Sequence, residues 1–247
     1  MGVLRQRMFG NQPRSSHARV VDELGRAIVS GEFPENSTLP GDQQLLERFG
    51  VSRSVLREAM KTLAAKGLVR AKSRVGTRVN PRDSWNFVDS DVISWKMLGG
   101  MDAEFVDHLR DMRLAFEPAA ARLAALNATA EEIVNLFSIV ARIDNPQHSR
   151  ESVAQEDLNF HIAIAVMSRN PFMRSVTTLI EAALAVSFQI SSPALSPEGI
   201  SRCASQHLRI ASAIASRDPD AADAAMREVV LEGADRAREA LDLDQTV

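Results

Sequence analysis

The chain has 247 residues, of which 45% are hydrophobic and 25% are charged; this composition excludes a disordered protein, and the length allows two domains. No apolar run approaches the roughly 20 residues that a membrane span requires, and the opening residues lack the apolar core of a secretory signal. The one cysteine, Cys203, cannot form an internal disulfide, so we expect a cytoplasmic protein in which this thiol is a small, partly buried apolar side chain.

Charge is distributed unevenly along the chain. Through Asn80 the sequence has 14 Lys and Arg against 7 Asp and Glu, whereas the remainder has 15 against 25. A basic block followed by an acidic block predicts two domains, of which only the first faces a polyanion such as nucleic acid. We expect an arm over residues 1–15, a DNA-binding domain over 16–80, a linker over 81–88 and a helical domain over 89–247.

Helical periodicity begins at Ser16. Apolar residues recur at helical spacing as far as Val29, and Gly31 follows as a stop signal. After the turn GEFPENS, the segment LPGDQQLLERFG predicts a second short helix, which Gly50 ends in the left-handed conformation.

A third helix is expected to begin with Ser52 as its N-cap. Its predicted buried stripe consists of Val55, Leu56, Ala59, Leu63 and Ala64. Arg53, Ser54 and Arg57 then face outward. The following segment GLVRAKSRVGTRV predicts two short strands around a tight turn that contains Gly76. Three helices and a hairpin make a winged helix-turn-helix, in which the third helix enters the major groove and the hairpin, the wing, contacts the neighbouring backbone.

Both of the elements that a winged helix presents to DNA carry basic side chains. Arginine pairs bidentately with guanine or binds phosphate, and short hydroxyl groups at a helix N-terminus bind phosphates. The wing contributes Arg70, Lys72, Arg74 and Arg78. A solvated side chain is the ordinary explanation of any single surface arginine, but this placement favours DNA contact.

The run LPGDQQLLERFGVSRSVLREAMKTLAAKGLV, followed by RVGTRV, resembles the GntR family of bacterial transcription regulators. The resemblance implies DNA contact by a set of residues on the second helix, the third helix and the wing: Gln43, Ser52, Arg53, Ser54, Arg57, Arg74 and Gly76. Two departures bear on the half-site that is read. Gln43 stands where the family often has Arg, and Ser73 replaces the first wing glycine.

Beyond the wing, helical patterns succeed one another and no segment alternates convincingly as a strand. We expect one helix whose apolar face runs from Phe105 to Leu123 and another that starts at a capping box, Thr129 through Glu132. Further helices are expected over residues 157–167, 173–190, 197–215 and 219–241. The predicted fold is therefore mostly α: an N-terminal winged helix-turn-helix followed by an all-helical bundle.

The segment DLNFH places Asp157 and His161 four residues apart, on one face of a helix. A carboxylate and an imidazole at this spacing can chelate a divalent metal, and His207 on a later helix can close the site. On the residues alone, an ion pair on a helix surface is the more frequent explanation.

The order R-x-x-x-E, D-x-x-x-H, N-P and Q-H resembles the FCD ligand-binding half of the FadR branch of GntR regulators. These positions are Arg113, Glu117, Asp157, His161, Asn170, Pro171, Gln206 and His207. The resemblance implies a divalent metal, with zinc expected, held by Asp157, His161 and His207. The family's fourth ligand falls near Val229 here, which leaves either an open site completed by water or effector, or a relic without metal.

The same resemblance implies a pocket for a small effector, with Arg113 and Asn170 as candidate contacts. Arg113 has two explanations. It either pairs with Glu117 inside the bundle or clamps an effector carboxylate, for which its geometry is well suited.

We therefore expect an effector-responsive homodimeric regulator that represses a sugar-acid catabolic operon and leaves double-stranded operator DNA when a small organic acid binds. The segment WNFVDSDVISW resembles the subgroup of repressors that respond to galactonate. One alternative is a metal-dependent hydrolase or lyase, since three ligands and an open position also describe a catalytic site. Another is a constitutive architectural DNA binder, against which the acidic second domain argues.

Overall fold

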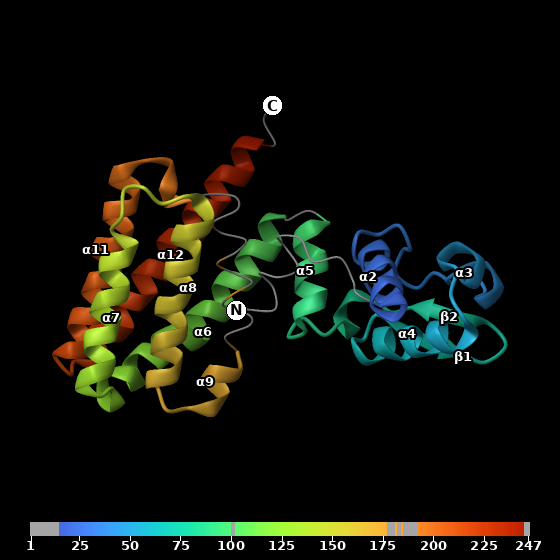
Figure 1. Ribbon diagram of the computed structural model, residues 1–247, viewed down its shortest axis with the longest axis horizontal. Coiled ribbons are helices and arrows are strands. Elements are labelled where there is room, and N and C mark those ends of the chain that lie inside the picture. Colours follow the sequence, from blue (N-terminus) through green and yellow to red (C-terminus); the bar gives the residue numbers. More distant parts are fainter. Residues whose placement is uncertain (1–14, 100–101, 177–180, 182–183, 185–191, 245–247) are drawn as a thin grey trace. The chain divides into compact units, whose positions relative to one another are not determined.

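The structure is a computed structural model that describes residues 15–99, 102–176, 181, 184 and 192–244 (Figure 1). Helices dominate both parts of the chain, which confirms the predicted fold class. The chain divides into two compact units, Met1–Met101 and Asp102–Val247, called here the N-terminal and the C-terminal unit.

The N-terminal unit follows the helix, helix, helix, hairpin order that the sequence predicts. Its first elements are α2 (Ser16–Val29), α3 (Asp42–Phe49), α4 (Arg53–Ala65), β1 (Val69–Lys72) and β2 (Gly76–Val79). The two strands are antiparallel, with Val69 opposite Val79 and Lys72 opposite Gly76. Their pairing forms the wing of a winged helix-turn-helix.

Local signals set the ends of these helices. Gly50 has a φ of 61° and ends α3 in the left-handed region, where a residue without Cβ is unstrained. The Ser52 hydroxyl accepts from the backbone N–H of Val55, 3.4 Å away, and caps α4.

The predicted buried stripe of α4 is wrong at one position, since Ala64 is exposed. At about 100° per residue, Ala64 lies roughly 80° from Leu56, at the edge of the buried face.

A third extended segment lies beside β2, where the sequence indicated a turn and then, from Leu39, the second helix. Thr38 forms an isolated antiparallel bridge with Arg78. The Leu39 N–H donates to the Thr77 carbonyl at 2.9 Å, and the Val79 N–H donates to the Ser37 carbonyl at 3.0 Å. The pairing is too short for a pattern of alternating residues, which explains why the sequence did not reveal it.

The residues expected as a linker, 81–88, pack within the N-terminal unit. The short turn η1 (Arg82–Ser84) leads to Trp85, whose indole N–H donates to the Asn80 carbonyl at 3.2 Å. Trp85 is buried in the same hydrophobic cluster as the winged-helix core. The expected linker is therefore a packed segment.

Helix α5 (Ser90–Leu98) also belongs to the N-terminal unit, which corrects the expectation that the second domain begins at residue 89. Trp95 is buried against α2, and its indole N–H donates to Asp22 at 2.8 Å. A Cβ at Gly25 would lie 2.4 Å from the Trp95 ring, so this contact requires glycine. Because α5 is buried on several sides, its sequence pattern does not indicate which core it joins.

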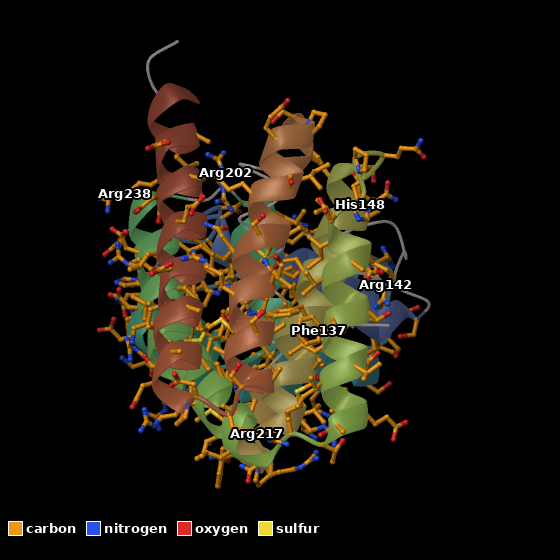
Figure 2. All side chains as sticks on the ribbon, turned by 90° about the vertical axis from the view of Figure 1, so that its left-hand side faces the viewer. Phe137, Arg142, His148, Arg202, Arg217 and Arg238 are labelled. Carbon is orange, nitrogen blue, oxygen red and sulfur yellow. The ribbon has the colours of Figure 1, made fainter. Side chains whose placement is uncertain are left out.

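The C-terminal unit is a helical bundle (Figure 1). Its described helices are α6 (Ala103–Asn127), α7 (Ala130–Ile143), α8 (Arg150–Met167), α9 (Pro171–Ser175), α11 (Pro197–Ala215) and α12 (Pro219–Asp244), with a short turn η2 (Pro193–Leu195) before α11. The long helices contact one another in the order α6, α8, α7, α11, α12 and back to α6. Figure 2 shows α12, α11 and α7 side by side.

Several helix starts in this unit follow the sequence signals. Thr129 and Glu132 form the predicted capping box of α7. Helix α8 begins earlier than expected, after Ser149, whose hydroxyl accepts from the Ser152 N–H. The expected helix over residues 173–190 lies mostly outside the described residues. Among the described helices, none is long and apolar enough to cross a membrane.

Candidate functional site

The exposed start of α4 presents the side chains that the sequence indicated for DNA. Arg53, Ser54 and Arg57 are exposed on its first two turns. The hydroxyl groups of Ser52 and Ser54 lie 2.9 Å apart beside the free backbone N–H groups of the helix N-terminus. The Arg57 side chain is 72% exposed, and its Nε atom lies 3.7 Å from the carboxylate of Glu58. A contact this long and exposed leaves the guanidinium available to another partner.

On α3, Gln43 is exposed, and its amide donates to the Glu47 carboxylate at 2.7 Å. This bond holds the side chain along its own helix. Gln43 therefore reaches a base only if it exchanges the Glu47 contact for a contact with DNA.

The tip of the wing is a tight turn with two residues in the left-handed region. Arg74 has a φ of 62° and Gly76 a φ of 103°, and the Val75 N–H donates to the Lys72 carbonyl at 3.1 Å. Arg74 and Lys72 are exposed there. The other two wing arginines bind the protein itself. Arg70 donates to the Asn80 side chain at 2.9 Å, and Arg78 donates to the Asn36 carbonyl.

The C-terminal unit holds a buried cluster of ionisable side chains. They are Arg113 and Glu117 on α6, Asp157 and His161 on α8, and His207 on α11. Each is at most 5% exposed. On α8 the buried stripe runs Val153, Asp157, Phe160, His161 and Ile164, so two polar residues occupy positions of the core face. Such burial is costly unless the groups pair or bind a ligand.

Arg113 and Glu117 form a two-point ion pair. The Nε and Nη2 atoms of Arg113 lie 2.5 and 3.2 Å from the two carboxylate oxygens of Glu117. Burial works to raise the pKa of Glu117, but the charges of Arg113 and His161 outweigh it and lower this pKa to about 2. Glu117 is therefore ionised at any physiological pH.

Glu117 also determines which ring nitrogen of His161 carries the proton. Its Oε2 atom lies 2.5 Å from the Nδ1 atom of His161, although the approach is not aligned as a good hydrogen bond. A bare Nδ1 would face the carboxylate lone pairs, so this nitrogen carries a proton. In the neutral ring the Nε2 atom then has a free lone pair.

A backbone carbonyl sets the protonation of His207 in the same way. Nδ1 of His207 lies 2.7 Å from the carbonyl oxygen of Cys203, which only accepts, so Nδ1 is the donor. Nε2 of His207 lies 3.0 Å from Oδ1 of Asp157, without the alignment of a hydrogen bond. Burial opposes protonation of this ring, but Cys203 and Asp157 raise the pKa of His207 well above its usual value.

Four buried atoms of this cluster have no hydrogen-bond partner among the described residues: Asp157 Oδ2, both ring nitrogens of His161 and His207 Nε2. His161 Nε2 lies 3.7 Å from Asp157 Oδ2. These atoms belong to the three residues that the sequence indicated as metal ligands. In both histidines Nδ1 is held by an oxygen, which leaves Nε2 as the ligand atom, and a metal bound at His207 would displace the proton that the raised pKa keeps on this ring. Asp157 and His207, together with Cys203, can each place a ligand atom within 4.8 Å of the others, which fits a divalent cation, whereas His161 lies outside this group.

The cluster adjoins a small pocket. Glu117 and His161 line it together with apolar residues of α6, α8 and α12 and with Met173 and Val176 at α9. Arg113 is not among its lining residues, since its nitrogens point to Glu117. Asn170 does not line it either. Its side chain caps α9 by accepting from the Phe172 N–H at 2.9 Å.

Two further positions bear on the ligand set. Val229, where the family would have a fourth ligand, is a buried residue of the hydrophobic core. Cys203, which the sequence indicated only as a small apolar residue, lies instead beside Asp157 and His207. A Cys four residues before a His on a helix was the available signal, but nothing in the sequence placed that helix against Asp157.

Comparison with known proteins gives two family matches. The model described as "Bacterial regulatory proteins, gntR family" matches residues 17–79, and the one described as "FCD domain" matches residues 108–232. A solved structure described as Lar, which controls expression of the Listeria monocytogenes agr system, has a TM-score of 0.64 at 20% identity. It covers 93% of this chain and 99% of that one, and this likeness concerns the fold.

Two curated relatives come from Escherichia coli (strain K12). YieP, described as an uncharacterized HTH-type transcriptional regulator, is 39% identical over 65% of this chain and 70% of the relative. The galactonate operon transcriptional repressor is 29% identical over 90% of this chain and 96% of the relative. Together with the winged helix and the helical bundle, these matches show that the chain belongs to the GntR family of bacterial regulatory proteins, with an FCD domain, and is a transcriptional regulator and not an enzyme.

Proposed function

We propose that this regulator is a repressor of a sugar-acid catabolic operon in the cytoplasm and leaves its operator when a small carboxylate binds the C-terminal unit. The similarity to the galactonate operon transcriptional repressor extends over 90% of the chain and supports this class of effector. The exposed arginines of α4 and of the wing support operator contact by the N-terminal unit.

The observation that carries the effector site is the set of four buried atoms without hydrogen-bond partners among the described residues, on Asp157, His161 and His207. These residues would hold a divalent cation, with zinc as the expected ion, because imidazole nitrogens and a carboxylate oxygen are its usual ligands. When bound, such a cation supplies a Lewis acid for a carboxylate or hydroxyl oxygen of the effector.

The other polar residues hold this site in shape. Arg113 holds Glu117 in place, and Glu117 determines the tautomer and the position of the His161 ring. We therefore favour an indirect role for Arg113, as a positioning residue, over a direct clamp on the effector. Asn170 caps α9, and Met173 of that helix lines the pocket, so Asn170 positions one wall of the effector site.

The repressor acts as a homodimer in this proposal. A single recognition helix reads only a few base pairs, and two helices related by a two-fold axis read a near-palindrome with the required specificity. Light scattering at micromolar concentration should give the mass of a dimer, and a stable monomer that binds single half-sites without cooperativity would contradict it.

The decisive test measures DNA affinity in the presence of candidate effectors. Operator DNA is selected from a random pool with the full chain, and its binding is followed by fluorescence anisotropy against a panel of sugar acids. We expect one acid to weaken binding at least tenfold without being consumed, and its neutral parent sugar to have no effect. Addition of a chelator should abolish the response.

A matched pair of variants locates the response. Asp157→Asn should remove the effect of the acid, whereas Asp144→Asn, an exposed aspartate at the end of α7, should leave it unchanged. If no acid changes DNA affinity, or if Asp157→Asn responds like the wild type, the proposed effector site is wrong. The operator binding of the N-terminal unit would stand in either case.

A further inference from the structure

We infer that Cys203 is a thiolate ligand of the same metal, so that this chain replaces the family's missing histidine at Val229 with a sulfur donor from α11. This inference rests on the proposed metal site. It concerns a residue for which the family resemblance implies no role.

The position of Cys203 carries the inference. Cys203 and His207 lie four residues apart on α11, on the same face, and are 4% and 1% exposed. The Sγ atom lies 3.9 Å from Oδ1 of Asp157 and 3.7 Å from Nδ1 of His207. One ligand atom from each of Asp157, Cys203 and His207 can be chosen so that all lie within 4.8 Å of one another.

The separation of Cys203 Sγ from Asp157 Oδ1 is close to that of two ligands of a tetrahedral metal. Bonds of about 2.0–2.1 Å to nitrogen or oxygen and about 2.3 Å to sulfur place neighbouring ligand atoms roughly 3.3–3.6 Å apart. The sulfur of Cys203 is within a few tenths of an ångström of that range from Asp157.

A second observation points independently to a ligand here. Asp157 Oδ2 and His207 Nε2 are buried and have no hydrogen-bond partner among the described residues. The Cys203 thiol approaches the other atom of each group, Oδ1 of Asp157 and Nδ1 of His207, so its packing leaves Oδ2 and Nε2 without a partner. A cation bound by the thiolate and by these atoms satisfies all of them at once.

The ligand set has a chemical consequence. Thiolate sulfur favours zinc and disfavours magnesium and manganese, which prefer oxygen. His161 is not one of this group, although its Nε2 lies 3.7 Å from Asp157 Oδ2. A metal held by these residues would accept an effector oxygen as a further ligand.

The experiment uses the full chain loaded with Co²⁺, a spectroscopic substitute for zinc, and separately with Zn²⁺. Cys203 is the one cysteine of the sequence, so a near-ultraviolet sulfur-to-cobalt charge-transfer band can come from no other residue. X-ray absorption of the zinc form should show one sulfur at about 2.3 Å. Cys203→Ala should still take up Co²⁺, but without the band and with affinity reduced at least tenfold.

The possible outcomes separate the inference from the proposed site. Metal uptake by the wild-type chain with only nitrogen and oxygen neighbours would overturn the role of Cys203 and leave the metal site standing. A charge-transfer band that persists in Cys203→Ala would also overturn it. No uptake of either ion would remove the metal site and this inference together. If Cys203→Ala does not fold, the X-ray absorption of the wild-type chain decides alone.

Discussion

The two units of this chain place the charged residues of their candidate sites in opposite environments. In the N-terminal unit Arg53 and Arg57 are exposed, with at most a long, weak contact to a neighbour. In the C-terminal unit Arg113, Glu117 and Asp157 are almost fully buried. An exposed charge costs the folded state little free energy and is available to a polyanion. A buried charge costs the folded state several kcal/mol unless it is paired or binds a ligand. Exposed charges therefore indicate the candidate site of the N-terminal unit, and buried charges indicate that of the C-terminal unit.

The largest effect should come from breaking the buried pair. Glu117→Ala leaves the guanidinium of Arg113 buried without its two-point partner, and we expect a loss of about 3–5 kcal/mol in the free energy of unfolding of the C-terminal unit. Urea unfolding followed by far-ultraviolet circular dichroism measures it. Both tryptophans, Trp85 and Trp95, belong to the N-terminal unit, so their fluorescence should report an unchanged transition there.

An exposed ion pair of the same unit provides the control. Arg142 on α7 (Figure 2) contacts Glu156 at 2.9 Å, with side chains 47% and 20% exposed. Glu156→Ala should cost less than about 1 kcal/mol. Equal losses for the two variants would mean that burial does not distinguish the pairs, and the comparison between the units would fail.

Metal addition should sharpen the comparison by acting on one unit alone. Zinc at a hundredfold excess over its dissociation constant should stabilise the C-terminal unit by about 2.7 kcal/mol, because the folded site binds it and the unfolded chain does so far less. Circular dichroism should show the shift and tryptophan fluorescence should not. A shift in fluorescence alone would place the metal in the wrong unit.

Removing an exposed arginine should affect DNA binding and not folding. Arg53→Ala and Arg57→Ala should each weaken specific operator binding by about 1–3 kcal/mol at matched salt, if the residue reads a base. Their unfolding curves should overlay that of the wild type. Lys61→Ala is the control, since Lys61 is exposed on the same helix but paired with Glu58 at 3.0 Å. Operator binding as tight as wild type in both arginine variants would remove α4 as the recognition helix.

The smallest effect concerns the wing tip. Arg74→Gly removes a backbone strain of about 1 kcal/mol at a φ of 62°, which stabilises the folded state. Glycine also raises the conformational entropy of the unfolded chain, which destabilises the folded state by roughly 0.4–1 kcal/mol. These terms nearly cancel, so stability should change by less than about 0.5 kcal/mol. The slope of log affinity against log salt should fall by about 1 per protomer, as one phosphate contact is lost. Arg74→Lys should keep the slope, and an unchanged slope in Arg74→Gly would exclude phosphate contact by this residue.

Sequence reasoning succeeded where the signal was local. Gly50 and Ser52 act within one helical turn, and the capping box at Thr129 depends on residues three apart. The spacing of Asp157 and His161 likewise defines one helix face without any tertiary information. Such features are determined by backbone geometry, which a short window of sequence contains.

Sequence reasoning failed where the answer depended on which surfaces meet. Helix α5 is buried on several sides, so nothing local assigned Trp95 to the N-terminal core. Cys203 has the spacing of an apolar core residue of α11, and only the packing of α11 near α8 brings its sulfur to Asp157. The extended segment around Thr38 is defined by a single bridge to Arg78, and a segment this short shows no alternation of apolar and polar residues in the sequence.

The contact between Gly25 and Trp95 limits how this regulator can exchange parts with its relatives. A recombination point placed directly after the wing, at Asn80, would leave Gly25 facing a gap and strip α2 of the indole that donates to Asp22. A DNA-binding module that keeps its own core must therefore carry α5 with it, up to the junction between Met101 and Asp102. Chimeric repressors cut at that junction should retain the parental operator preference, whereas those cut at the end of the wing should lose solubility before specificity can be measured.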